Sequence, residues 1–131
     1  MRLLPIVLEC VIMLAALSGS HAQDSTRARI GRLAERDSIT ILITDSGLGG
    51  LSVCADIDRR MRKEGVYRNA RLVFANALPE SNRGYNKMAT TEEKVEVFDA
   101  ALNGMARWYA PDAILVACNT LSVLIPHTRF V

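Results

Sequence analysis

Residues 39–50 read ITILITDSGLGG, and this stretch decides the fold. Its first six residues are apolar or β-branched without alternation, which is typical of a strand covered on both faces in a parallel sheet. Asp45 and Ser46 follow the strand, and the glycines after them favour a tight turn into a helix. We expect that helix to end at Gly65. Its apolar positions recur at helical spacing: Leu51, Cys54, Ile57 and Met61.

Two further strands are predicted downstream, at Ala70–Ala75 and Ala113–Ala117. The helix between them is expected to begin after a capping box formed by Thr90 and Glu93, and to end at Pro111. A third helix is predicted from Thr120 to Ile125, closed by Pro126. The order β-α-β-α-β-α predicts an α/β fold in three layers, with a mostly parallel sheet and flanking helices, over residues 39–131.

Residues 1–22 have the layout of a secretory signal peptide, with an early arginine, an apolar run and small residues before a cleavage point. Glu9 interrupts the run, and Cys10–Leu17 is too short to form a stable membrane span. We therefore expect an exported protein, periplasmic or secreted. A later start codon, which would give a cytoplasmic protein, is the alternative. Residues 23–38 are polar and predict a solvated linker with at most a short helix.

Composition argues against several classes of partner. The formal net charge of the chain is only +2 and 5% of its residues are aromatic, so we expect no nucleic-acid partner. There is no CxxC motif and no cluster of histidines and cysteines, so we expect no metal site. Cys54 and Cys118 are expected to be free thiols.

The turn DSGLGG has three interpretations. It could cradle a phosphate at a helix N-terminus. However, it lacks the Lys-Ser/Thr pair of a Walker loop, and Ser52 occupies the last glycine position of a GxGxxG motif. The glycines could also serve only to shape the turn. The third interpretation rests on Asp45, because a carboxylate at a strand tip can accept hydrogen bonds from a ligand ammonium group or a neighbouring polar group.

A second polar turn, VACNT at residues 116–120, places Cys118 where a strand passes into a helix. A helix N-terminus stabilises an anion, so this position predicts a reactive thiolate with a lowered pKa. Asn119 and Thr120 can cap the helix or bind a polar substrate. The alternative is that Cys118 is a small buried apolar residue.

Together, DSGLGG and ACNT, each at the end of a buried strand and in this order, resemble the N-terminal half of the glutamate racemase and aspartate/glutamate racemase family. The resemblance covers about residues 39–130. It implies cofactor-independent racemisation of a small acidic amino acid, glutamate or aspartate. It also implies that Cys118 is one of two catalytic thiols, that Asp45 assists it near the substrate amino group, and that Ser46, Asn119 and Thr120 bind substrate.

The loop over residues 76–89 departs from the family pattern. The family has a Pro-Tyr-Gly turn that meets the substrate carboxylate, whereas this loop reads Asn-Arg-Gly-Tyr-Asn. Gly84 and Tyr85 are the counterparts that the resemblance suggests. Arg83 could bind a substrate carboxylate through its planar guanidinium, although an exposed loop arginine is more often simply solvated.

The second lobe of the family, with its second catalytic cysteine, has no counterpart in this sequence. We therefore expect a truncated chain that racemises poorly alone, or a site completed by another chain or in a homo-oligomer. Two other functions stay open. The chain could be a catalytically inactive module that binds a small carboxylate or amino acid, or a redox-sensing thiol protein that uses Cys118.

Overall fold

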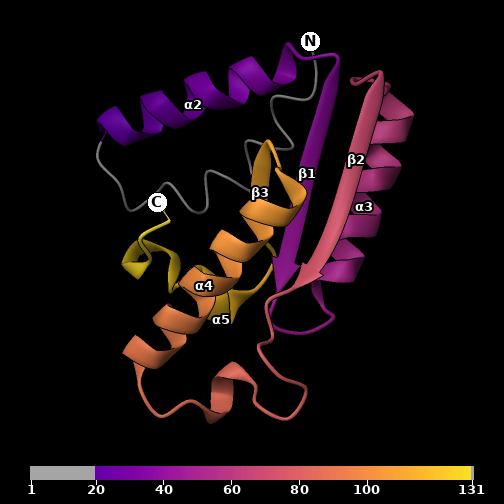
Figure 1. The fold of residues 1–131 in the computed structure, drawn as a ribbon. Coiled ribbons are helices and arrows are strands. Elements are labelled where there is room, and N and C mark those ends of the chain that lie inside the picture. Colours follow the sequence, from indigo (N-terminus) through magenta and orange to yellow (C-terminus); the bar gives the residue numbers. More distant parts are fainter. Residues whose placement is uncertain (1–19, 131) are drawn as a thin grey trace.

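The computed structural model describes residues 20–130 and contains one parallel three-stranded sheet (Figure 1). Strand β1 (Ser38–Asp45) lies in the centre, between β2 (Asn69–Asn76) and β3 (Ala113–Val116), and both pairings are parallel. The predicted α/β class, with a parallel sheet and flanking helices, is confirmed. The domain boundaries stay a prediction.

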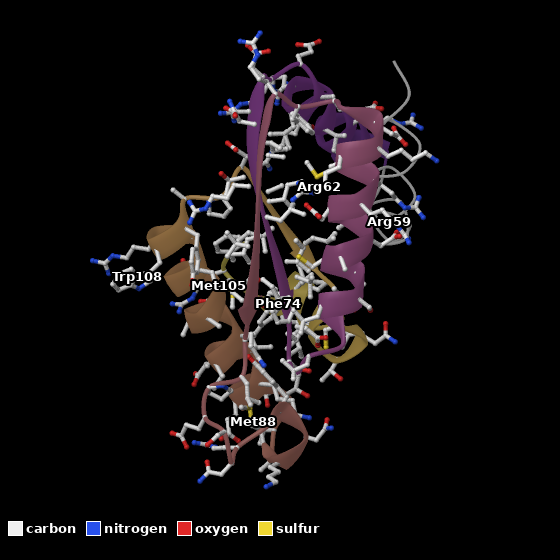
Figure 2. The ribbon with its side chains drawn as sticks, turned by 90° about the vertical axis from the view of Figure 1, so that its right-hand side faces the viewer. Arg59, Arg62, Phe74, Met88, Met105 and Trp108 are labelled. Atoms are coloured by element: carbon white, nitrogen blue, oxygen red, sulfur yellow. The ribbon has the colours of Figure 1, made fainter. Side chains whose placement is uncertain are left out.

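Two long helices cover opposite faces of the sheet. Helix α3 (Gly50–Glu64) connects β1 to β2, and α4 (Thr91–Tyr109) connects β2 to β3. Because right-handed crossovers that run in opposite directions along a sheet place their helices on opposite sides, α3 and α4 sandwich the strands. Figure 2 shows this arrangement with the sheet seen edge-on.

Strand β1 is buried on both faces, as its continuous apolar run predicts. Leu42 packs in the cluster that includes Phe98 and Leu102 of α4, and all three side chains are buried. The neighbouring Ile43 points to the opposite face and is also fully buried. Burial of this kind supplies most of the stability of a small domain, at roughly 25 cal/mol per Å² of apolar surface.

Helix α4 begins at the predicted capping residues. The Thr90 hydroxyl accepts a hydrogen bond from the Glu93 backbone N–H at 3.1 Å. The Glu93 carboxylate accepts one from the backbone N–H of Ala89 at 3.0 Å, one residue before the position that a capping box predicts. The helix ends at Tyr109, where Ala110 adopts a left-handed conformation with φ of 44°.

Two predicted elements differ from the structure. Helix α2 (Ser20–Ala34) occupies much of the stretch expected to be a linker, because arginine, alanine and leucine favour helix even where little is buried. The third helix is shorter than predicted. It consists of α5 (Asn119–Ser122), and Pro126 lies inside the separate 3₁₀ turn η2 (Ile125–His127) because proline fits the first turn of a helix.

The predicted signal peptide lies largely outside the described residues, which begin at residue 20. Within the part of the chain that the structure describes, no helix combines the length and apolar character needed to cross a bilayer.

Candidate functional site

The two polar turns meet at the carboxyl edge of the sheet. Thr44 of β1 pairs with Val116 of β3, so the residues that follow these strands emerge side by side. The Cys118 sulfur lies 3.1 Å from the Ser46 hydroxyl, and either group can donate the hydrogen bond. The Asp45 carboxylate lies beside the Cys118 thiol, and this thiol lowers the pKa of Asp45. The structure therefore brings together a thiol, a hydroxyl and a carboxylate from positions more than 70 residues apart.

Asp45 is held as a buried acceptor at the end of β1. One carboxylate oxygen accepts from the backbone N–H of Gly47 at 3.2 Å, and the other accepts from that of Gly50 at 2.5 Å. Burial raises the pKa of Asp45. The hydrogen bonds from Cys118 and from the backbone N–H groups of the turn outweigh burial, so the pKa lies below its ordinary value. Asp45 is consequently an anion at neutral pH.

This carboxylate occupies the position that a bound phosphate would take. The N–H groups of Gly47 and Gly50, which a phosphate cradle would offer to its ligand, are already donated to Asp45. The turn is therefore built around an internal anion. This arrangement disfavours the interpretation of DSGLGG as a phosphate-binding loop.

Gly50 is required by a close approach between elements. A Cβ atom at this position would lie 3.0 Å from the Asp45 Cβ, 3.0 Å from the Phe74 ring and 3.3 Å from the Ala117 Cβ. A side chain would push the start of α3 away from β1 and β3, and so lengthen the hydrogen bond to Asp45. Gly47 differs, because a Cβ there would meet nothing within 4 Å.

Asn76 is a participant that the sequence analysis did not identify. It ends β2, and its amide N–H donates to the carbonyl of Gly47 at 3.0 Å. Its side-chain oxygen accepts from the backbone N–H of Leu78 at 2.7 Å. The two hydrogen bonds of the Asn76 side chain therefore connect the turn after β1 to the loop after β2. Its place at the same carboxyl edge was the signal that could have revealed it.

The second turn presents polar groups beside Cys118. Asn119 is exposed and Thr120 is half-buried. Cys118 occupies the N-cap position of α5, which has only four residues, so the helix dipole expected to stabilise a thiolate is short. The charged group beside the thiol is instead the Asp45 carboxylate, whose pKa Cys118 lowers. A thiol next to a fixed carboxylate suits proton transfer.

The loop residues have partners of their own. Arg83 is exposed and forms an ion pair with Glu93.

The Tyr85 side chain is buried, and its hydroxyl donates to the carbonyl of Ala77 at 2.9 Å. Burial and the charge of nearby Cys118 raise the pKa of Tyr85 to about 12. Gly84 contributes extended backbone before the short 3₁₀ turn η1 (Tyr85–Lys87). Tyr85 thus supports the site from the core.

Cys54, the other cysteine of the described residues, lies on α3. It is a half-buried free thiol, and burial, followed by the charge of Asp58, raises its pKa. Within residues 20–130, no three His, Cys, Asp or Glu side chains gather in a way that could hold a metal ion.

Comparison with known proteins confirms the resemblance that the two turns suggested. The chain is 33% identical over 89 residues to a glutamate racemase from Vibrio vulnificus strain CMCP6, an alignment that covers 67% of this chain and 30% of that protein. It is 38% identical over 92 residues to a glutamate racemase from Haemophilus ducreyi, covering 69% of this chain and 31% of the relative. The chain thus spans about three tenths of the length of these relatives. No protein-family model and no solved structure matches it.

The packing at Gly50 gives a first prediction. Gly50→Ala should lower the free energy of unfolding by about 1–3 kcal/mol, because a methyl group there overlaps Asp45 and Phe74. Gly47→Ala is the matched control in the same turn and should change stability much less. Urea denaturation measures both. Equal losses in the two variants would contradict the role given to Gly50.

Asp45 predicts a pH dependence of stability. Its pKa is lower in the folded state than in the unfolded chain, so its ionised form contributes stability above the unfolded value of about 3.9, and this contribution disappears as pH falls through the folded value. The stability difference between wild type and Asp45→Asn should therefore be constant above about pH 5 and narrow in acid. Denaturation of both proteins across this pH range measures the stability difference. A stability difference that does not change with pH would refute the prediction.

Proposed function

We propose that this chain, whose sequence is similar to part of the glutamate racemases, supplies a thiol for α-proton transfer on a small acidic amino acid. The observation that supports the proposal best is the contact of Cys118 with both Asp45 and Ser46 at the carboxyl edge of the sheet. The named relatives make glutamate the first substrate to test, with aspartate next. The activity of a whole racemase is part of this proposal, because the alignments cover only about three tenths of the relatives.

In the proposed reaction, the Cys118 thiol first gives its proton to the Asp45 carboxylate, and the resulting thiolate removes the proton from the α-carbon of the substrate. A bond between sulfur and hydrogen forms, the Cα–H bond breaks, and the electron pair remains on the α-carbon, delocalised into the adjacent carboxylate. Asp45 accepts hydrogen bonds from the substrate ammonium group and keeps the sulfur in position. Ser46, Asn119 and Thr120 donate hydrogen bonds to the substrate carboxylates, which stabilises the charge that develops there.

Inversion requires a second acid on the opposite face of the substrate. If Cys118 returns the proton that it removed, the starting enantiomer is regenerated. The other cysteine of the described residues, Cys54, lies on α3, in the same sheet-and-helix unit as Cys118. We therefore propose that the second acid comes from a protein segment, in this chain or a partner, that faces Cys118 across the substrate.

Hydrogen exchange tests this proposal. In deuterated water, the chain should replace the α-hydrogen of glutamate by deuterium with retention of configuration, because the Cys118 thiol exchanges with solvent between abstraction and return. Cys118→Ala should reduce the exchange rate at least about 100-fold, the usual contribution of a positioned acid or base. Cys54→Ala is the matched control and should exchange normally. Proton NMR and chiral chromatography follow the label and the configuration.

The outcomes separate the competing functions. Exchange that survives in Cys118→Ala contradicts the proposed role of this thiol. Binding of glutamate or aspartate without any exchange supports a catalytically inactive binding module. Exchange with inversion would place both acids within this chain.

A further inference from the structure

A cavity lies at the end of the sheet opposite Cys118, where the strands begin. It has a volume of about 540 Å³ and is bordered by the first residues of β1 and β2, by the last two turns of α3, and by Asp112, which precedes β3. Strand β1 has eight residues. Because a strand rises about 3.3 Å per residue, the cavity lies roughly 20 Å from the Asp45 end of β1. It is therefore separate from the site at the Cys118 edge.

Three arginine side chains line this cavity. Arg62 comes from α3, Arg71 belongs to β2, and Arg68 precedes the first residue of that strand. Figure 2 shows Arg62 on the side of α3 toward the sheet, whereas Arg59 projects from the outer side of the same helix. A guanidinium group forms forked hydrogen bonds with a phosphate or carboxylate group. Arginines that border one concave surface from two elements therefore favour an anionic ligand.

The two carboxylates of the cavity lining are already engaged by other groups. Asp58 accepts from the Nε–H of Arg62 at 2.9 and 3.0 Å, and the terminal N–H groups of this guanidinium have no hydrogen-bond partner among the described residues. Asp112 forms an ion pair with Arg36 and accepts from the backbone N–H of Thr40 at 2.8 Å. These two carboxylates therefore do not neutralise the other arginines of the cavity.

Arg68 and Arg71 supply the positive charge that a ligand would neutralise. Both are exposed, and neither forms an ion pair with any residue that the structure describes. Ser38 and Tyr67 add hydroxyl groups to the lining. Burial, followed by the charge of Asp112, raises the pKa of Tyr67, so its hydroxyl stays a neutral hydrogen-bond donor. Excess positive charge within a concave surface raises the local concentration of anions.

The size of the cavity indicates an organic ligand. A single phosphate ion would fill only a small part of it, whereas clefts of about 300–1,000 Å³ are typical of sites for small organic molecules. Met61 and Leu72 provide apolar lining for the body of such a ligand.

We propose that this cavity binds a small organic anion, whose phosphate or carboxylate groups are held by Arg62, Arg68 and Arg71. Binding here is independent of the proposed racemase chemistry, because no residue of the Cys118 edge takes part.

Calorimetric titration of the full chain tests this site with two probes, inorganic phosphate and citrate, at constant ionic strength. At least one probe should bind. The double variant Arg68→Gln/Arg71→Gln should weaken that binding at least about tenfold, because it removes charged hydrogen bonds to the anion. Arg59→Gln/Arg60→Gln is the matched control, since it removes the same charge from α3 outside the cavity lining, and should leave the affinity unchanged.

The two probes also identify the group that the cavity recognises. Tighter binding of phosphate supports a phosphate ester as the ligand, and tighter binding of citrate supports a carboxylate. If citrate instead binds at the Cys118 edge, Arg68→Gln/Arg71→Gln will bind it normally, which contradicts the proposal. Titrations in which neither probe binds overturn it. So does binding that both double variants weaken equally, because that result indicates a diffuse effect of surface charge.

Discussion

The buried carboxylate of Asp45 is the constraint on which the carboxyl edge of the sheet depends. It ends the central strand, accepts a hydrogen bond from the Gly50 N–H at the start of α3, and lies beside the Cys118 thiol that follows β3. Its backbone carbonyl also accepts from Ala77 N–H at 2.8 Å, which ties in the segment after β2. One residue thus connects all three strand ends. A buried anion is stable only when it is well hydrogen-bonded, so the turn, the helix start and the cysteine are fixed together.

The features that depend on local sequence could be predicted. The uninterrupted apolar run of residues 39–44 identified a doubly covered strand, and Thr90 with Glu93 identified the start of α4. The meeting of Asp45 with Cys118 followed from parallel topology, because strand ends of such a sheet share an edge. These inferences needed only residue type, spacing and chain order.

The remaining features depend on tertiary packing, which periodicity does not encode. Tyr85 looked like a ligand in a polar loop, but its ring packs edge-on against Phe98, with ring centroids 6.4 Å apart. Asn76 is one polar residue among several, and only its bond to Gly47 distinguishes it. Helix α5 stops after four residues although its sequence continues as apolar, because the chain turns into the proline-containing η2. The exposure of Trp108 could not be predicted either, because the helical pattern of the sequence places Trp108 next to buried positions.

The proposed site depends on the Cys118 thiol lying against the Asp45 carboxylate, and infrared spectroscopy measures this contact most directly. The S–H stretching band of Cys118 can be isolated by subtracting the spectrum of Cys118→Ala from that of the wild type. Donation to a carboxylate lowers this frequency relative to a free thiol, and Asp45→Asn should move the band back toward the free value. A band at the free-thiol frequency that does not respond to Asp45→Asn would contradict the account.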